Sequence, residues 1–125
     1  MLRLLLIATL SFTFPQAATG VYGTWRGKSD CVGDRPSCRD EITRYVFRRS
    51  GDATAPITVD ADKFVNGVAE NMGALACQAG AKGDVSCRIP PGVWQFKATG
   101  DTLTGSLILN DGSQARRVLA HREKP

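Results

Sequence analysis

The amino-acid sequence predicts an all-β protein, in which about eight short strands form one antiparallel meander closed into a small barrel. Two observations carry this prediction. Gly, Asp, Asn and Pro recur at intervals of roughly ten residues, and the runs between them are short, β-branched, aromatic or alternating. In addition, four cysteines in a chain of 125 residues are typical of a small domain held by two disulfides.

The N-terminus has the features of a secretory signal peptide. Arg3 precedes an apolar run at residues 4–14, which is too short to cross a bilayer as a helix, and small residues follow in "PQAA". We therefore expect residues 1–18 to be a signal peptide and 19–125 to be one secreted or periplasmic domain. The alternative is a buried N-terminal strand or helix. The first cysteine is Cys31, so none lies at the cleavage point to carry a lipid, and we expect no membrane anchor.

The charge of the chain is mildly positive. It is +4 overall, and since Arg3 is the one charged residue in the signal segment, residues 19–125 carry +3. Such a surplus favours weak contact with anions but is not the signature of a nucleic-acid-binding protein. We expect a monomer that binds no nucleic acid.

The predicted strands follow one another with short connections. Their ranges are 21–26, 42–49, 56–60, 63–68, 74–78, 85–89, 93–99, 102–109 and 114–122. Residues 110–112, "NDG", predict a hairpin before the last strand. The least regular stretch is 61–73, where near-helical spacing of apolar residues makes a turn of helix the alternative, and "NG" at 66–67 indicates a tight turn or bulge.

Short connections favour a barrel over a β-sandwich. A sandwich is the alternative fold, but it needs longer crossover connections, and only residues 26–40 are long enough for one. Closing the meander into a barrel also removes the exposed strand edges.

One register explains the second pair of cysteines. If 74–78 and 85–89 form a hairpin with Cys77 opposite Cys87, then Leu75 lies opposite Ile89, and the apolar side chains of both strands share a face. This agreement predicts the disulfide Cys77–Cys87.

The remaining pair, Cys31–Cys38, then follows by elimination and closes a small loop, although four cysteines allow three pairings in principle. The spacings do not match the C-x2-C knuckles of zinc sites, and a C-x-x-C redox motif is absent from the sequence. We expect no metal and no cofactor.

Catalytic signatures are missing as well. The one histidine, His121, lies on the last predicted strand, and no G-x-S-x-G elbow occurs. The carboxylates lie near strand ends and turns, where acidic residues are ordinary. These are Glu41, Asp60, Asp62, Glu70 and Asp101. We expect a protein that is not an enzyme.

The start of the first strand, "VYGTWRG", carries a Gly-x-Trp triplet. With a meander of strands and a basic last strand, it resembles the lipocalin and wider calycin pattern. The resemblance implies that Trp25 closes one end of the barrel, that Gly23 lets the strand bend, and that Arg116 or Arg117 packs across the indole.

A barrel of this kind suggests a binding protein for a small apolar or amphipathic ligand. The alternative for the same inward side chains is an ordinary filled core. The candidate lining residues are Trp25, Tyr45, Phe47, Trp94, Phe96, Leu107 and Leu109.

A basic face suggests a second function, a periplasmic protein–protein module such as an inhibitor or envelope accessory. Arg44, Arg48 and Arg49 lie on the second predicted strand, beside the disulfide-pinned loop 27–40. They could meet an acidic protein or another acidic envelope component. The alternative is an ordinary solvated strand face. Further arginines lie on the last strand, where one of Arg116 and Arg117 must point inward.

Overall fold

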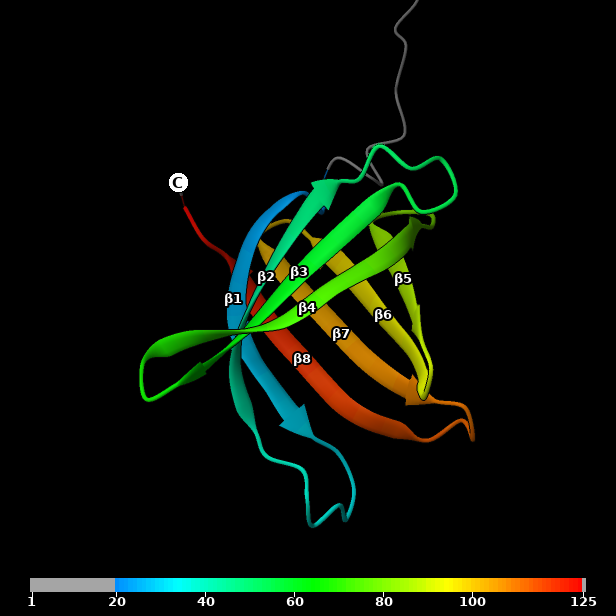
Figure 1. Cartoon of the computed structure of the whole chain (residues 1–125). Helices are drawn as coiled ribbons and strands as arrows, with labels where there is room; N and C mark the ends of the chain where they lie inside the picture. The colour runs from blue at the N-terminus through cyan, green and yellow to red at the C-terminus, as the bar shows by residue number, and fades with distance from the viewer. Residues whose placement is uncertain (1–19, 125) are drawn as a thin grey trace, which may run out of the picture.

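A computed structural model describes residues 20–124 of the chain. They form eight strands in one closed antiparallel barrel, in which each strand pairs with the next and the last returns to the first (Figure 1). The strands are β1 (Gly23–Cys31), β2 (Glu41–Arg49), β3 (Ile57–Val65), β4 (Val68–Ala79), β5 (Asp84–Ile89), β6 (Gly92–Thr99), β7 (Thr102–Leu109) and β8 (Gln114–Arg122).

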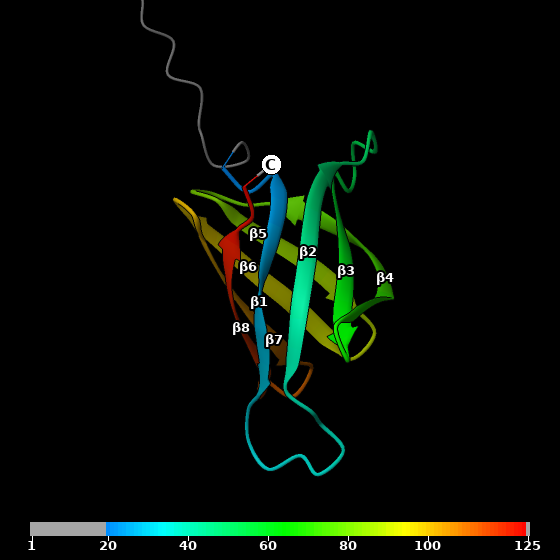
Figure 2. The same cartoon turned by 90° about the vertical axis from the view of Figure 1, so that its left-hand side faces the viewer.

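The predicted fold class is confirmed, and the sandwich alternative is wrong. The stretch that could have served as a crossover is shorter than the sequence suggested, because β1 continues to Cys31. Only the loop at residues 32–40 connects β1 with β2, and it lies at the end of the barrel opposite the start of β1 (Figure 2).

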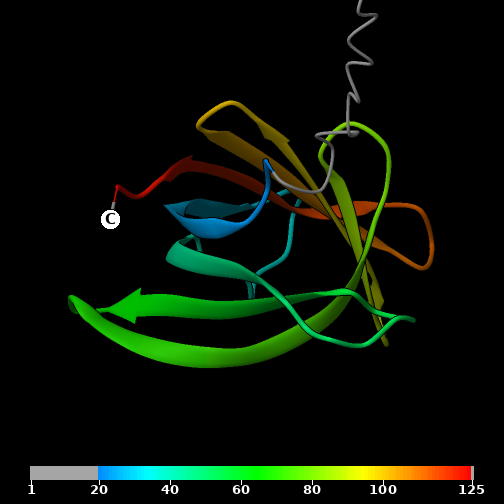
Figure 3. The same cartoon turned by 90° about the horizontal axis from the view of Figure 1, so that it is seen from above.

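The stretch at residues 61–73 is a hairpin, so the helical alternative is wrong. The predicted strands 56–60 and 63–68 merge into β3 and the start of β4, with Asn66 and Gly67 as the turn. Their φ angles are 51° and 78°, both left-handed as a type I′ hairpin turn requires. This hairpin projects beyond the barrel wall (Figures 1 and 3).

Alternate residues of each strand fill the barrel interior. Phe96 is the centre of an aromatic cluster: its ring lies 5.5 Å from Tyr45, 5.4 Å from Phe47 and 5.5 Å from Trp94. Gly105 on β7 makes room for this ring, since a Cβ there would lie 2.8 Å from it. The other buried apolar side chains include Val21, Trp25, Ile57, Val59, Val85, Leu103, Val118 and Ala120.

Both predicted disulfides, Cys31–Cys38 and Cys77–Cys87, are confirmed. Two disulfides in so small a domain indicate an oxidising compartment. One detail of the register is wrong, however. Leu75 does not pair with Ile89, because pairing of β4 with β5 stops at Cys77–Cys87. Beyond that pair the two strands diverge.

The predicted signal peptide, residues 1–18, lies outside the described residues. Within residues 20–124 the structure contains no helix that is long and apolar enough to cross a membrane.

Candidate functional site: a small cavity at one end of the barrel

The last strand sends an arginine into each end of the barrel. Val118 and Ala120 of β8 are buried, so Arg116 and Arg122, which share their parity, also face inward. Arg117 faces outward and is exposed. The two inward arginines produce different local structures.

At one end, Arg122 closes the barrel over Trp25. Its guanidinium carbon lies 4.1 Å from the centre of the indole, and it donates hydrogen bonds to the carbonyls of Tyr22 (2.7 Å) and Gly20. Trp25 is fully buried and donates from Nε1 to the carbonyl of Val21 at 2.8 Å. This is a cation–π contact, in which the guanidinium covers the indole.

The residue across the indole is therefore Arg122 rather than Arg116 or Arg117. The register explains why, since Trp25 pairs with Arg122 while Arg116 lies opposite Cys31 at the far end of β1. Gly23 has a φ of 125°, and a Cβ there would come 3.0 Å from Nη1 of Arg122. A glycine at this position thus leaves room for the arginine.

At the other end, a cavity of about 130 Å³ opens beside the β1–β2 loop. A cavity of about 150 Å³ holds one benzene molecule, so this one is of the order of a single small ring or a short aliphatic group. One wall is apolar and largely aromatic, and the opposite rim is polar. The lining residues are Ser29, Glu41, Tyr45, Ala61, Met72, Gly73, Leu75, Trp94, Phe96 and Arg116.

Arg116 organises the polar rim. It donates from Nη1 to the Ser29 hydroxyl at 3.1 Å and from Nη2 to the Arg39 carbonyl at 3.0 Å, and Nη2 lies 3.7 Å from a Glu41 carboxylate oxygen. The Arg116 side chain is 18% exposed. A partly buried guanidinium held by neutral groups and one longer ion pair retains the ability to meet a further anion or acceptor.

Two hydroxyls lie deeper in the interior. Burial raises the pKa of Tyr45, while the neighbouring Thr43 and Ser29 side chains and the charge of Arg116 oppose the rise. Tyr45 therefore stays a neutral phenol at physiological pH. Thr43 Oγ1 is also buried, and it forms no hydrogen bond with the described residues.

Three of the predicted lining residues line this cavity, namely Tyr45, Trp94 and Phe96. Trp25 and Phe47 are buried in the core instead. Leu107 and Leu109 are half-buried on β7 and are not among the lining residues.

Sequence reasoning missed the polar rim. Ser29 shares the inward parity of Trp25 on β1, and Glu41 shares that of Tyr45 on β2. Predicted strands a few residues longer would have placed Ser29 and Glu41 inside the barrel. Leu75 shares the inward parity of Cys77 on β4 and could have been found in the same way. Met72 could not, because the bulge in β4 opposite Ala61 changes the parity.

The predicted basic face is largely neutralised on its own sheet. Arg44 pairs with Asp62 at 2.8 Å, and Arg48 pairs with Asp60 at 2.7 Å. Arg49 lies 4.5 Å above the ring of Tyr22. The three arginines share the strand that the sequence suggested, but the charges of Arg44 and Arg48 are met by acidic residues of β3.

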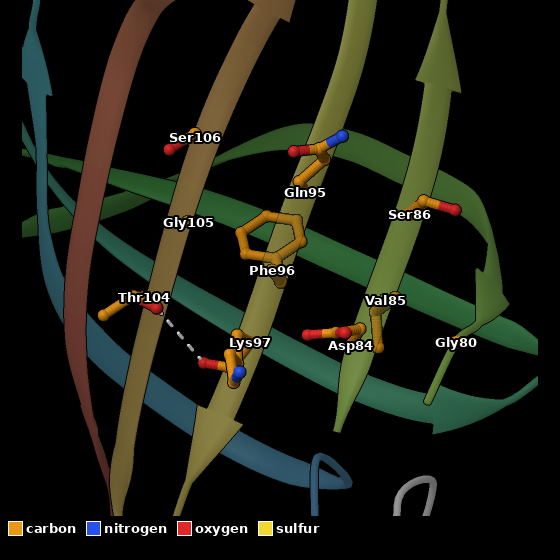
Figure 4. Close-up of a pocket in the computed structure, with 10 residues that line it drawn as sticks. All are labelled: Gly80, Asp84, Val85, Ser86, Gln95, Phe96, Lys97, Thr104, Gly105 and Ser106. Atoms are coloured by element: carbon orange, nitrogen blue, oxygen red, sulfur yellow. Dashed lines mark hydrogen bonds between the residues drawn. The ribbon is translucent and has the colours of Figure 1, made fainter. Parts of the chain in front are cut away.

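A second depression, of about 440 Å³, lies over β5, β6 and β7 (Figure 4). Two cross-strand rows of exposed or half-exposed polar residues form much of it: Asp84, Lys97 and Thr104 in one, and Ser86, Gln95 and Ser106 in the other. These are ordinary residue types for a solvated sheet face, and no hydroxyl or carboxylate in it is buried.

His121 is exposed on the outer face of β8, away from the cavity. Within residues 20–124, no three His, Cys, Asp or Glu side chains come together in a way that could hold a metal ion.

Comparison of this chain with protein-family models, with curated proteins and with solved structures finds no match.

Proposed function

We propose that this protein is a non-enzymatic binding protein of the periplasm or the secreted fraction, and that its ligand is a small amphipathic molecule. The observation that carries the proposal is the cavity of about 130 Å³ with an aromatic wall and an arginine at its rim. The Gly-x-Trp strand and the Arg122–Trp25 contact further support a lipocalin-like protein. The two disulfides suit an oxidising compartment.

The size of the cavity limits the ligand. Binding sites that enclose a drug-sized ligand measure roughly 300–1,000 Å³, so a cavity of 130 Å³ takes one ring or a short branched chain. Trp94 and Phe96 stack with an angle of 7° between their planes and offer a flat apolar surface to such a group.

The polar rim of the cavity determines which polar group the ligand should carry. Arg116 is a permanent cation, and the neutral Tyr45 phenol lies within the same cavity lining. Together they favour a compound with one carboxylate or other hydrogen-bond acceptor attached to a small apolar body. Benzoate has this form, and toluene is its uncharged counterpart.

Titration by NMR tests the proposal. Benzoate is added to the ¹⁵N-labelled chain while the indole Nε1–H signals of Trp25 and Trp94 are followed. We expect a saturable shift at Trp94 and little change at Trp25, because only Trp94 lines the cavity. Absence of a saturable shift at Trp94 with either benzoate or toluene would overturn the proposal.

Ala61→Leu supplies the matched variant. Ala61 is 7% exposed and lines the cavity, so the larger side chain fills part of the void and should abolish the shift. The control is Ala69→Leu, the same change at an exposed position of the projecting hairpin, which should leave the titration unchanged. Equal binding by both variants would place the ligand elsewhere.

The arginine-face module is the weaker candidate. The ion pairs of Arg44 and Arg48 with β3 already satisfy two of its three charges. Its test is capture of an acidic partner protein by the Arg44→Glu, Arg48→Glu double variant, and unchanged capture would reject it.

A further inference from the structure

The barrel wall has one weak seam, between β4 and β5. Only three residue pairs join them, Cys77–Cys87, Gln78–Ser86 and Ala79–Val85. Every other neighbouring pair of strands is joined along most of its length; β3 and β4, for example, pair from Ile57–Cys77 to Val65–Val68. Figure 1 shows β4 and β5 meeting near one end and then diverging. The Cys77–Cys87 disulfide lies at the apex of this notch.

The seam leaves one edge of β4 without a partner strand from residue 68 to residue 76. Cys77 and Cys87 have a Cα–Cα distance of 4.3 Å, which identifies a non-hydrogen-bonded antiparallel pair. The backbone groups of Cys77 therefore point away from β5. By alternation, the N–H and C=O groups of Ala76 and Ala74 point into the notch.

The side chains along this edge do little to block pairing. Natural edge strands are commonly protected by lysine, proline or inward-pointing charges. Residues 68–76, "VAENMGALA", contain one charged residue, Glu70, and no proline. Val68 is 65% exposed and Met72 is 45% exposed. The protective features of this stretch are limited to Glu70 and the bulge opposite Ala61.

The notch and the cavity adjoin. Met72 and Leu75 of β4 line the cavity, and Trp94 lines it from the far side. Side chains on the inner face of a strand added to β4 would therefore lie over an apolar opening. On the outer face stands Arg88 of β5, which is exposed and has no ion-pair partner within residues 20–124.

We propose that the open edge of β4 binds an extended segment of another protein by strand addition. The segment carries apolar residues on alternate positions, which face the cavity, and an acidic residue between them, which faces Arg88. Backbone pairing with Ala74 and Ala76 supplies affinity, and the disulfide sets the point where pairing stops. A second copy of this chain fits less well, because Glu70, the sole acidic residue of this edge, alternates in one row with Val68 and Met72 instead of lying between the apolar positions.

This inference does not depend on the small-ligand function. The groups that pair with the segment are backbone amides and carbonyls of β4, whereas a small ligand contacts side chains within the cavity. Loss of one function by substitution therefore need not remove the other.

The test begins with a random-peptide library displayed on phage and selected on the whole chain. Selected peptides are synthesised, and their affinities are measured by fluorescence anisotropy. Ala76→Pro removes one open N–H without removing a ladder hydrogen bond, as edge strands allow. We expect it to weaken binding about fivefold to tenfold, the effect of one lost hydrogen bond. Ala76→Thr keeps the N–H and should bind within about twofold of the parent chain.

Hydrogen exchange on the unmodified chain keeps the test independent of whether the proline variant folds. The amides of Ala74 and Ala76 should exchange fast in the free chain and about tenfold or more slower with bound peptide. Arg88→Glu should reverse the selected preference from acidic to basic residues, and Ala61→Leu should retain the exchange protection.

Four outcomes would overturn the proposal. They are a library without enriched binders, peptides that bind Ala76→Pro as well as the parent chain, Ala74 and Ala76 amides already protected in the free monomer, and a dimer that Ala76→Pro dissociates. The last would assign the edge to a second copy. Failure of benzoate binding affects none of these measurements, so the two proposals fail separately.

Discussion

Each end of the barrel contains an inward-facing arginine of β8, but the two arginines have opposite effects on their surroundings. Arg122 lies over a fully buried Trp25 and donates to the backbone carbonyls of Tyr22 and Gly20 and to the Asp101 carboxylate. Arg116 meets the Ser29 hydroxyl and a more distant Glu41, and a cavity of about 130 Å³ remains beside it. The first end is closed by packing, and the second stays open.

The difference comes from what each arginine finds opposite it. Where the neighbouring strand supplies a large aromatic ring, the guanidinium stacks and excludes solvent. Arg116 pairs instead with Cys31 and donates to the small Ser29 two positions away on β1, and a cavity remains beside it. We conclude that Arg122 covers Trp25 at the first end, whereas Arg116 borders a cavity at the second.

The largest expected effect comes from comparing the two tryptophans. Trp25→Ala should lower the free energy of unfolding by about 3–5 kcal/mol, since the indole is fully buried and its Nε1–H is hydrogen-bonded. Trp94→Ala should cost clearly less, because Trp94 is only partly buried, yet it should abolish benzoate binding. Urea unfolding measures both. Equal losses of stability would contradict the division between the ends.

The two disulfides should also differ, although both close short loops. Chain entropy predicts about 2–3 kcal/mol for each. Cys77 and Cys87 additionally hold the apex of the notch, where three residue pairs join β4 to β5. Replacing both by alanine should therefore cost more than the same change at Cys31 and Cys38. The urea midpoints of the two double variants measure these losses of stability. A larger loss for the variant without Cys31 and Cys38 would show that the seam between β4 and β5 does not limit stability.

The paired arginines allow a finer comparison. Arg122→Lys should lower the free energy of unfolding by about 1–2 kcal/mol, because lysine cannot both stack on the indole and reach two carbonyls. Arg116→Lys should cost less but weaken benzoate relative to toluene. Calorimetric titration of both ligands, with urea unfolding of both variants, measures the difference. If Arg122→Lys alone altered the benzoate preference, the site would be at the wrong end.

The ionisation of Tyr45 tests how far water reaches into the end of the barrel that contains the cavity. Burial raises the pKa of Tyr45 in the folded chain above its value when unfolded. The stability that neutral Tyr45 contributes is therefore complete below the pKa of the unfolded chain, about 10. It is lost as the pH rises through the higher pKa of the folded chain. Tyr45→Phe should flatten the fall in stability above about pH 10. An identical alkaline profile for the parent chain and this variant would show that Tyr45 is freely solvated.

The smallest effect concerns Asp62 on the outer wall. Its hydrogen bond from Arg44 lowers its pKa. The resulting stability is present above the unfolded pKa, about 4, and is lost as the pH falls through the lower folded value. Asp62→Asn should reduce this acid dependence by less than about 1 kcal/mol, as expected for a partly exposed pair. Asp34→Asn, in the exposed β1–β2 loop, is the control. A larger change in Asp34→Asn would exclude the Arg44 pair as the cause.

Much of the fold was predictable because it rests on local periodicity. Alternation on β2 places Thr43, Tyr45 and Phe47 inside, and the turn residues separate the strands. The Cys77–Cys87 pairing was also predictable, because one register satisfied both the bridge and the apolar face. Residues 61–73 were harder, since the bulge near Met72 breaks the period of two and imitates helical spacing.

The candidate site was predictable only in part. Tyr45, Trp94 and Phe96 are inward aromatic residues, which sequence patterns identify readily. Which arginine meets which end was not predictable, because it depends on the offset between β1 and β8, and that offset is set by closure of the whole barrel.

By itself, the sequence determined that the chain is an all-β barrel with two local disulfides. Strand alternation, turn chemistry and cysteine spacing are short-range properties, and they act before the chain closes. Only the tertiary structure decided that Arg122 stacks on Trp25, that Arg116 borders a cavity and that β4 pairs with β5 only from Cys77 to Ala79. These features depend on strand tilt and divergence around a closed sheet, where a small change in register moves a side chain from one end to the other.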